Sequence, residues 1–411
     1  MASDKGCFGC LLGPPRGVTS AFVTGLSPHI DLSSGNFYVN AGERYAWLRD
    51  NDPVHHDAAT NLWVLSRYED VKYAGSNPAI FSSAGGSRPE TGPLPWMIDL
   101  DPPEHHKRRK LVSSGFAPPR VRAAEVNIAG LCDELIDAVC ERGDCDFVED
   151  LAAPLPLIVI GDMLGIPAAD RDQLLRWSDG MLASLSGEPG QIERAAQAFG
   201  EFAEYAVAMI AERKARPTHD LVSVLVHADV DGDRLTEDEV IYETLLLLVG
   251  GDETTRHVMT GGMEQLHRNP DQRSDLQRDL SLLPAAVEEM LRWVSPIKSM
   301  ARTMTADLQL RGRTLPAADK VVLLYESADF DEAQFPDPDR FDIRRNPNDH
   351  VAFGFGAHYC LGASLARLEI STMFQRLFAR LPDIDCADEP RRFFTSISYM
   401  PMRFTPTTRS H

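Results

Sequence analysis

The sequence predicts a single-domain protein that is mostly α-helical and carries small β-sheets. Three observations support this fold class. Helix-like stretches dominate from residue 102 onward, β-like stretches are short, and strands do not alternate with helices as they do in parallel α/β folds. The 411 residues are 43% hydrophobic, which is enough for a large core. We expect one domain over residues 31–411, preceded by a loose stretch over residues 1–30 that is rich in Gly, Pro and Ser.

The expected elements follow the hydrophobic pattern along the chain. A β-pair is expected at Val54 and at 62–65, with a turn near 58–61, and a short helix follows over 68–75. Residues 101–104, Asp-Pro-Pro-Glu, begin a helix, because proline is tolerated in the first turn and acids suit a helix N-terminus. Further helices are expected over 121–142, 191–214, 221–227, 236–268, 283–293 and 362–381, a strand over 321–326, and β-structure over 393–404.

Charge and hydropathy exclude several classes of protein. The net charge of −20 argues against a nucleic-acid partner, because phosphate binding needs a basic surface. No run of about twenty apolar residues is present, so no transmembrane helix is expected. The apolar patch Phe8 to Leu12 is broken by Gly13-Pro14-Pro15 and lacks the length of a signal peptide. We therefore expect a soluble, cytoplasmic protein.

The cysteines are expected to be reduced thiols, because their number is odd and they are scattered through a long chain. The seven are Cys7, Cys10, Cys132, Cys140, Cys145, Cys360 and Cys386. Cys7 and Cys10 have the C-x-x-C spacing of a redox or zinc half-site. No second pair stands at zinc spacing, so we interpret them as part of the N-terminal tail.

The stretch 353–362, Phe-Gly-Phe-Gly-Ala-His-Tyr-Cys-Leu-Gly, carries the strongest chemical signal in the chain. Its glycines let the backbone turn tightly and approach a flat ligand. A helix-like pattern follows Cys360, and the N–H groups at a helix N-terminus favour a thiolate and lower its pKa. Cys360 is therefore a candidate nucleophile or metal ligand. The ordinary alternative is a buried cysteine in a glycine-rich turn.

The helix expected over 236–268 has polar residues in an apolar middle. Thr236 to Glu239 forms a capping box, and 245–249 is too apolar for a surface helix. Residues 250–255, Gly-Gly-Asp-Glu-Thr-Thr, then place two glycines in the helix at about 1 kcal/mol each relative to alanine. Either the helix packs closely against a neighbour, with Thr254 hydrogen-bonded to the carbonyl four residues earlier, or it widens into a ligand groove lined by an acid–alcohol pair.

The spacing Phe-x-x-Gly-x-His-x-Cys-x-Gly resembles the haem-thiolate loop of the cytochrome P450 family, and the glycine–acid–threonine segment resembles that family's oxygen-binding groove. The resemblance covers residue 31 to the C-terminus. It implies the cytochrome P450 fold, with haem b between the long interior helix and the helix that follows the cysteine loop. It also implies that Cys360 binds the iron and that the haem contacts Phe353, Gly354, Gly362, Ala366 and Gly251.

The resemblance further implies how protons and dioxygen are handled. Thr254 and Glu253 would be the catalytic residues that deliver protons during oxygen activation. Gly250 and Gly251 would make room for dioxygen. The implied activity is that of a monooxygenase, which hydroxylates an unactivated C–H bond.

A haem carries two propionates, and the resemblance implies four donors for them. His105 and Arg109 lie four residues apart, on one face of the expected helix, and match the family's propionate-binding pair. Arg302 and His358 match the other two usual donors. The alternative for the basic run that includes His105 and Arg109 is a solvated basic face.

Lys107, Arg108 and Lys110 are expected to point away from the haem. The chain resembles the soluble bacterial branch of the family, which implies that a ferredoxin and its NAD(P)H-dependent reductase supply electrons. We expect these three residues to help dock that acidic electron donor. The protein itself is expected to be a monomer.

A structural network is also implied. Glu289 and Arg292 lie three residues apart on one helical face, and Arg340 stands in the proline-rich turn 335–341. Together they resemble the family's Glu–Arg–Arg network, which fixes the scaffold behind the cysteine loop.

Three stretches, 94–99, 140–147 and 250–257, resemble actinobacterial cytochrome P450 enzymes that oxidise the terminal methyl of sterol side chains. The implied substrates are cholesterol and cholest-4-en-3-one, oxidised at C26/C27 to an alcohol or further to the carboxylic acid. By position in the family, the substrate-binding residues are Met97, Ile98, Leu247, Val249, Gly250, Ile297, Lys298, Met300, Ser396 and Ile397. Each of these could equally belong to the ordinary core, and the Lys298 amine is expected to reach solvent.

Two rival functions remain open at the level of the sequence. A fatty-acid or polyketide hydroxylase would share every motif described above. A haem-thiolate gas sensor or electron carrier is the rival from another class. The acid–alcohol pair Glu253 and Thr254 argues against the sensor, since a sensor does not need proton delivery.

Overall fold

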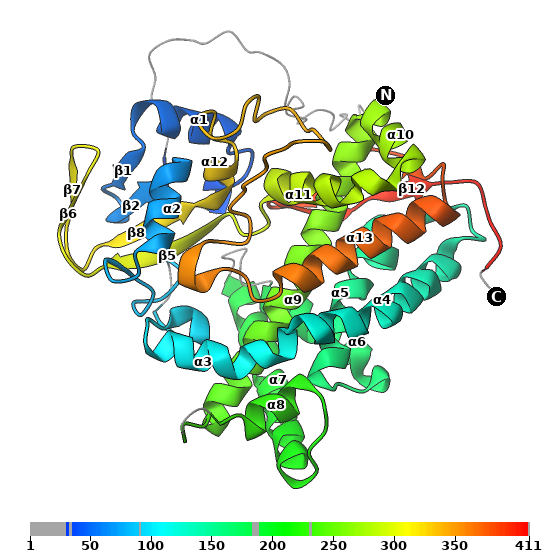
Figure 1. Ribbon diagram of the computed structural model, residues 1–411, viewed down its shortest axis with the longest axis horizontal. Helices are drawn as coiled ribbons and strands as arrows, with labels where there is room; N and C mark the ends of the chain where they lie inside the picture. The colour runs from blue at the N-terminus through cyan, green and yellow to red at the C-terminus, as the bar shows by residue number, and fades with distance from the viewer. Residues whose placement is uncertain (1–29, 33–34, 90–91, 183–188, 230–231, 410–411) are drawn as a thin grey trace, which may run out of the picture.

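The structure is a computed structural model that describes residues 30–32, 35–89, 92–182, 189–229 and 232–409 (Figure 1). Helices dominate and the sheets are small, which confirms the predicted fold class. The helices are α1 (Gly42–Asn51), α2 (Tyr68–Ser76), α3 (Glu104–Ser113), α4 (Pro118–Val139), α5 (Pro154–Leu164), α6 (Arg171–Leu182), α7 (Pro189–Ala215), α8 (Leu221–His227), α9 (Glu237–Arg268), α10 (Pro270–Arg278), α11 (Leu283–Val294), α12 (Tyr325–Asp329) and α13 (Ala363–Arg380). The expected N-terminal tail, including Cys7 and Cys10, lies outside the described residues apart from Ile30.

Twelve short strands form four sheets in the described part of the chain. The strands are β1 (Val54–Asp57), β2 (Leu62–Leu65), β3 (Phe81–Ser82), β4 (Asp144–Asp146), β5 (Ser299–Met304), β6 (Leu308–Leu310), β7 (Arg313–Leu315), β8 (Lys320–Leu324), β9 (Asp385–Cys386), β10 (Arg391–Phe393), β11 (Ser396–Tyr399) and β12 (Pro401–Arg403). The largest sheet has the order β1-β2-β8-β5-β3, in which only β2 and β8 are parallel. Because β2 and β8 are far apart in sequence, this sheet joins an early segment of the chain to a much later one.

The five-stranded sheet and the long helices occupy different sides of the molecule. Figure 1 shows the five-stranded sheet with α1, α2 and α12 on one side and the long helices on the other. The remaining sheets are β4-β12-β9, β10-β11 and β6-β7. The β-structure expected over 393–404 therefore resolves into three strands that serve two sheets. The predicted strand over 321–326 ends at Leu324, where the backbone turns directly into α12.

Helix α9 crosses the interior, as its apolar sequence predicts. The capping box is present: the Thr236 hydroxyl accepts from the backbone N–H of Glu239, and the Glu239 carboxylate accepts from the N–H of Thr236. The middle of the helix is buried against α5, α7, α11 and α13. A Cβ on Gly251 would lie 3.0–3.3 Å from Ile160 of α5, so this glycine allows the two helices to approach closely. Among the described residues, no helix is both long and apolar enough to span a membrane.

Candidate active site

The cysteine loop is held in place by backbone contacts and by glycines in conformations that other residues rarely adopt. Gly354 and Gly356 have φ of +68° and +69°, in the left-handed region. The N–H of Cys360 donates to the carbonyl of Phe353 at 2.9 Å and closes the loop. A Cβ on Gly356 would lie 2.1 Å from the carbonyl oxygen of Gly75 in α2, so only glycine fits there. The loop is thus clamped between α2 and the start of α13.

Burial and hydrogen bonding act in opposite directions on the Cys360 thiol. Burial raises the pKa of Cys360, and this is the largest effect. The backbone N–H groups of Gly362 and Ala363 donate to the sulfur and lower the pKa, as do the charges of Arg109 and Arg367. The predicted donors are therefore present, but the expectation that they lower the pKa overall is wrong, because burial outweighs them. A metal cation that replaces the proton would restore the balance in favour of the thiolate.

Four basic side chains from α3, β5 and the cysteine loop converge. The rings of His105 and His358 lie 4.1 Å apart, and the His358 Nε2 shares a hydrogen bond of 3.1 Å with the Ser83 hydroxyl. Burial, then the charge of Arg109, lowers the pKa of His105 to about 4. Burial, then the charge of Arg302, lowers the pKa of His358 to about 2. Both imidazoles are therefore neutral donors or acceptors near pH 7, beside two arginines.

This basic cluster fits an anionic group with several acceptor oxygens. The Nδ1 of His105 is buried and finds no hydrogen-bond partner among the described residues, and Arg302 is only 4% exposed. A buried polar atom without a partner costs free energy, and a buried guanidinium calls for an anion. Two carboxylates, such as the propionates of a haem, would satisfy both. The residues present therefore fit the group that the sequence implies.

The polar middle of α9 contains the other predicted site residues. In Figure 1, α9 passes behind α13. The Thr254 hydroxyl donates to the Gly250 carbonyl at 2.9 Å, so the hydrogen bond of the ordinary interpretation is present. The Glu253 carboxylate is buried and bonded to Arg256 and, at 2.9 Å, to the Nε2 of His257. A Cβ on Gly250 would meet open space, in contrast to the tight contact of Gly251. Features of both interpretations therefore occur within one turn.

Two further buried acids near this turn were not predicted as site residues. The Ser178 hydroxyl donates to Asp252 at 2.5 Å. Burial raises the pKa of Glu369 in α13 well above its usual range, and the charge of Asp252 adds to this effect. Both effects favour the protonated form of Glu369. An acid between Leu368 and Ile370 in a helical pattern is the sequence signal that could have drawn attention to it.

The Glu–Arg–Arg network is present with one member different from the prediction. Arg292 donates to both carboxylate oxygens of Glu289, from Nε and Nη2, at 2.8 Å each. The second arginine is Arg345, whose Nε lies 3.0 Å from Glu289 Oε2. Arg340 is not in the network: its side chain is 69% exposed and only approaches Asp342 at 4.0 Å. The turn after residue 335 directs Arg340 outward and brings Arg345 back to Glu289.

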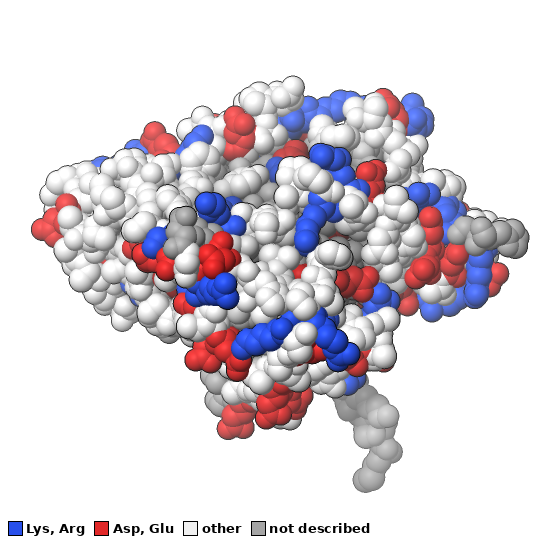
Figure 2. Space-filling view, turned by 60° about the horizontal axis from the view of Figure 1, so that its bottom comes forward, with Lys and Arg blue, Asp and Glu red and all other residues white. Residues whose placement is uncertain are grey.

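The basic run of α3 is largely engaged within the protein. On the face shown in Figure 2, basic and acidic groups stand side by side. Lys107 pairs with Asp233 at 3.1 Å. Arg108 pairs with Glu243 at 3.1 Å and also with Glu239, both on α9. The expectation that Arg108 points to an outside partner is therefore wrong, because this guanidinium ties α3 to α9.

The predicted substrate residues come from four parts of the chain. By element they are Met97 and Ile98 in a 3-10 helix (Met97–Asp99), Leu247, Val249 and Gly250 in α9, Ile297 and Lys298 just before β5, Met300 in β5, and Ser396 and Ile397 in β11. They do not share one apolar cluster. Met97 and Leu247 belong to one cluster, Ile297 and Met300 pack against a second, and Ile397 belongs to a third.

Lys298 differs from its prediction. Its Nζ donates to the Val294 carbonyl at 2.7 Å and to the buried Glu326 carboxylate at 3.0 Å. The amine therefore neutralises an internal acid and does not reach solvent. A buried acid at residue 326, directly after an apolar strand, is the signal in the sequence that favours such a pair.

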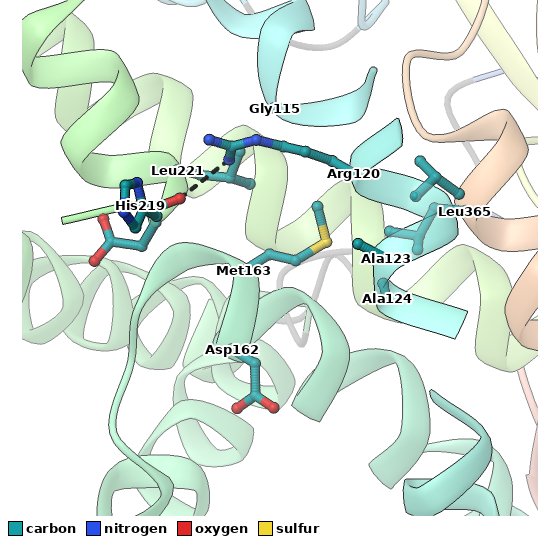
Figure 3. A pocket seen from close by; sticks show the side chains of 11 residues that line it. Gly115, Arg120, Ala123, Ala124, Asp162, Met163, His219, Leu221 and Leu365 are labelled. Carbon is teal, nitrogen blue, oxygen red and sulfur yellow. Dashed lines mark hydrogen bonds between the residues drawn. The ribbon is translucent and has the colours of Figure 1, made fainter. Parts of the chain in front are cut away.

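A cavity of about 510 Å³ opens elsewhere in the molecule (Figure 3). It lies between Gly115, Arg120 in α4, Met163 in α5, His219 and Leu365 in α13. Arg120 donates to the His219 carbonyl at its edge. None of the predicted substrate residues lines this cavity, so it is separate from the candidate active site.

Comparison with known proteins places this geometry in a family. The family model for cytochrome P450 matches residues 180–382. The chain is 53% identical to the steroid C26-monooxygenase of Mycobacterium tuberculosis over 392 residues, which cover 93% of this chain and 98% of the relative. It is 40% identical to a methyl-branched lipid omega-hydroxylase of Mycobacterium bovis over 352 residues, 82% of each chain.

The fold matches solved structures as well. CYP109E1 from Bacillus megaterium in complex with testosterone is 34% identical, with a TM-score of 0.81, and the match covers 89% of this chain and 99% of that chain. Because a 53% identical relative is matched over nearly its whole length, and because the cysteine loop and its buried basic cluster fit a haem, the chain belongs to the cytochrome P450 family.

Proposed function

We propose that this protein is a haem-thiolate monooxygenase that hydroxylates the terminal C26/C27 methyl of cholesterol or cholest-4-en-3-one and oxidises the alcohol further to the carboxylic acid. The observation that carries the proposal is the identity of 50% and 53%, over more than nine-tenths of the chain, with two relatives named steroid C26-monooxygenase. Residues 31–411 would form one haem domain.

The site residues take distinct roles in this proposal. Cys360 would bind the iron, and Phe353, Gly354, Gly362, Ala366 and Gly251 would contact the haem. His105, Arg109, Arg302 and His358 would hold the propionates, which would satisfy the buried Nδ1 of His105. When bound, the haem supplies the activation of dioxygen, with the thiolate as electron donor.

Proton transfer would rest on the polar turn of α9. The Thr254 hydroxyl donates its hydrogen bond to the Gly250 carbonyl. Its oxygen is therefore available to accept a hydrogen bond from a ligand in the open space beside Gly250. Glu253 is held by Arg256 and His257. It would relay a proton by exchanging one of these partners for water, and Thr254 would then pass the proton on.

An iron–sulfur ferredoxin, reduced by an NAD(P)H-dependent reductase, would supply the electrons. Lys110 remains exposed on α3, whereas Arg108 is held by α9. Docking would therefore depend on Lys110 more than on Arg108. We expect Lys110→Glu to raise the apparent KM for the ferredoxin several-fold at low salt. An unchanged KM would exclude this surface.

A branched-chain lipid is the second candidate substrate, supported by the 40% identical relatives named methyl-branched lipid omega-hydroxylase. It keeps the same reaction, terminal hydroxylation of a branched methyl. The two candidate substrates differ in the part of the molecule beyond the reacting methyl, which is a rigid ring system in the sterol and a flexible chain in the lipid.

The test combines spectroscopy with product analysis. The purified holoprotein is titrated with cholest-4-en-3-one and, separately, with a methyl-branched fatty acid, and a low-to-high-spin shift of the haem reports displacement of water. Turnover with a ferredoxin system should yield the C26/C27 alcohol and acid. Spin shift and turnover with the fatty acid alone would overturn the sterol assignment. A reduced carbon-monoxide spectrum without the thiolate signature in well-folded protein would overturn the haem-thiolate site itself.

A further inference from the structure

A sulfur pair lies at the far end of α9, in the three-stranded sheet β4-β12-β9. Met402 of the central strand pairs in register with Cys386 of β9. The Sγ of Cys386 lies 3.8 Å from the Sδ of Met402. Both side chains are buried, at 7% and 1% exposure. The candidate active site uses neither residue, and a thiol packed on a thioether is the ordinary interpretation of such a contact.

Two polar side chains lie beside Cys386 and reach solvent. A ring nitrogen of His267, in the last turn of α9, a carboxylate oxygen of Asp385 and the Sγ of Cys386 all lie within 4.8 Å of one another. The His267 Nδ1 lies 2.6 Å from Asp385 Oδ1. About a third of each of these two side chains is exposed. The cluster therefore combines a buried thiol with two partly exposed polar side chains.

The ligand types in this cluster are those that soft metal ions prefer. Thiolate and thioether sulfur select Cu(I), and imidazole is compatible with it, whereas carboxylates suit harder ions. Asp385 Oδ1 already accepts hydrogen bonds from His267, Arg273 and the N–H of Cys386. Asp385 is thus suited to orient the imidazole, as carboxylates do behind metal-bound histidines, and not to bind the ion itself.

The charges around the cluster favour a monovalent ion. Acids and bases are balanced one to one in the surrounding ion pairs: Glu264, Asp385 and Glu389 against Arg268, Arg273 and Arg392. A divalent ion that displaced one thiol proton would add a net positive charge beside three arginines. A monovalent ion that displaces the same proton leaves the charge unchanged.

We propose that Cys386, Met402 and His267 form a binding site for Cu(I), oriented by Asp385. Binding replaces the S–H bond of Cys386 with a bond from sulfur to Cu(I) and releases one proton to solvent. Copper stays in the +1 state and nothing is oxidised. Met402 and His267 complete a three-coordinate S₂N set without losing a proton.

The test is a competition titration of the haem-loaded protein under anaerobic, reducing conditions. Cu(I) is supplied as its coloured complex with bathocuproine disulfonate, and loss of that colour measures transfer to the protein. Cys7→Ser/Cys10→Ser serves as the background, so that the C-x-x-C pair does not bind copper. We expect one equivalent to transfer, with copper X-ray absorption showing two sulfur and one nitrogen neighbours.

Variants on that background separate the site from other thiols. Cys386→Ser should abolish the transfer, and Met402→Leu and His267→Asn should each weaken it about tenfold or more. Cys132→Ser, at a buried cysteine of α4 outside the cluster, should leave it unchanged. Met402→Leu preserves volume and keeps the test valid if Cys386→Ser fails to fold. Undiminished transfer to Cys386→Ser or Met402→Leu would overturn the proposal, as would Zn(II) binding in preference to Cu(I) in the background protein.

Discussion

Replacing Arg345 by alanine would remove one arm of the buried Glu289 network. The Arg345 guanidinium contacts Glu289 at 3.0 Å and donates to the carbonyls of Pro336, Asp337 and Arg340 at 2.7–3.1 Å. Its side chain is 9% exposed and that of Glu289 is fully buried. Removing one partner of a buried ion pair costs about 3–5 kcal/mol. We expect about 3 kcal/mol, the lower end, because Arg292 still neutralises Glu289.

Arg340→Ala is the matched control, because the exposed pair of Arg340 with Asp342 is worth at most about 1 kcal/mol. Arg345→Lys should fall between the two, since it keeps the charge but loses the planar fork. The measurement is urea unfolding of each variant, followed by helical circular dichroism and by haem release. Equal destabilisation by Arg340→Ala and Arg345→Ala would refute the assignment of Arg345 to the network.

Three further predictions concern α9. Thr254→Ala should lower hydroxylated product per turnover by about 10²-fold while leaving the sterol-induced spin shift intact, because it removes the hydroxyl that would pass protons on and not a contact with the sterol. An unchanged product yield would exclude Thr254 from proton delivery. Burial raises the pKa of Glu243 to about 7, so between about pH 4.5 and 7 the folded state binds more protons than the unfolded state. The free energy of unfolding should therefore fall as the pH rises through this range, by at most about 3 kcal/mol. Glu243→Gln should flatten this pH dependence in urea unfolding, and an unaltered pH dependence would contradict the raised pKa of Glu243. Gly251→Ala should destabilise the folded protein by about 1 kcal/mol through its contact with Ile160. Gly250→Ala should not destabilise the protein but should reduce the oxygen-dependent turnover. A greater loss of thermal stability in Gly250→Ala than in Gly251→Ala would refute the packing argument.

The sequence predicted those parts of the fold that depend on local pattern. Helix α9 and its capping box were readable because both depend on spacing within one segment. The change from strand to helix at Tyr325 could not be predicted, because it is fixed by buried hydrogen bonds of Asp329 with Ser295 and with the N–H of Val351. These contacts join segments that are distant in sequence, and no hydrophobic or capping pattern within one segment predicts them.

The candidate site, like the fold, was predicted where it depends on local motifs and missed where it depends on contacts between distant segments. The positions of Cys360 and of the basic cluster followed from motif spacing, although their roles toward a haem stay predictions. Arg340 was predicted because it stands in the proline-rich turn, whereas only the path of the chain beyond that turn shows that Arg345 is the arginine that returns to Glu289. The partner of Lys298 was missed because the backbone turn that presents Glu326 is not encoded in the residues around Lys298.

The contact between Gly356 and the Gly75 carbonyl has a consequence for how the protein is made. One partner leaves the ribosome near the start of synthesis and the other near the end, and the parallel pairing of β2 with β8 imposes the same delay. The cysteine loop therefore cannot reach its final shape until almost the whole chain has been translated. Haem capture would be one of the last events in the maturation of the protein, and a nascent chain interrupted before residue 356 would lack Cys360, the proposed iron ligand.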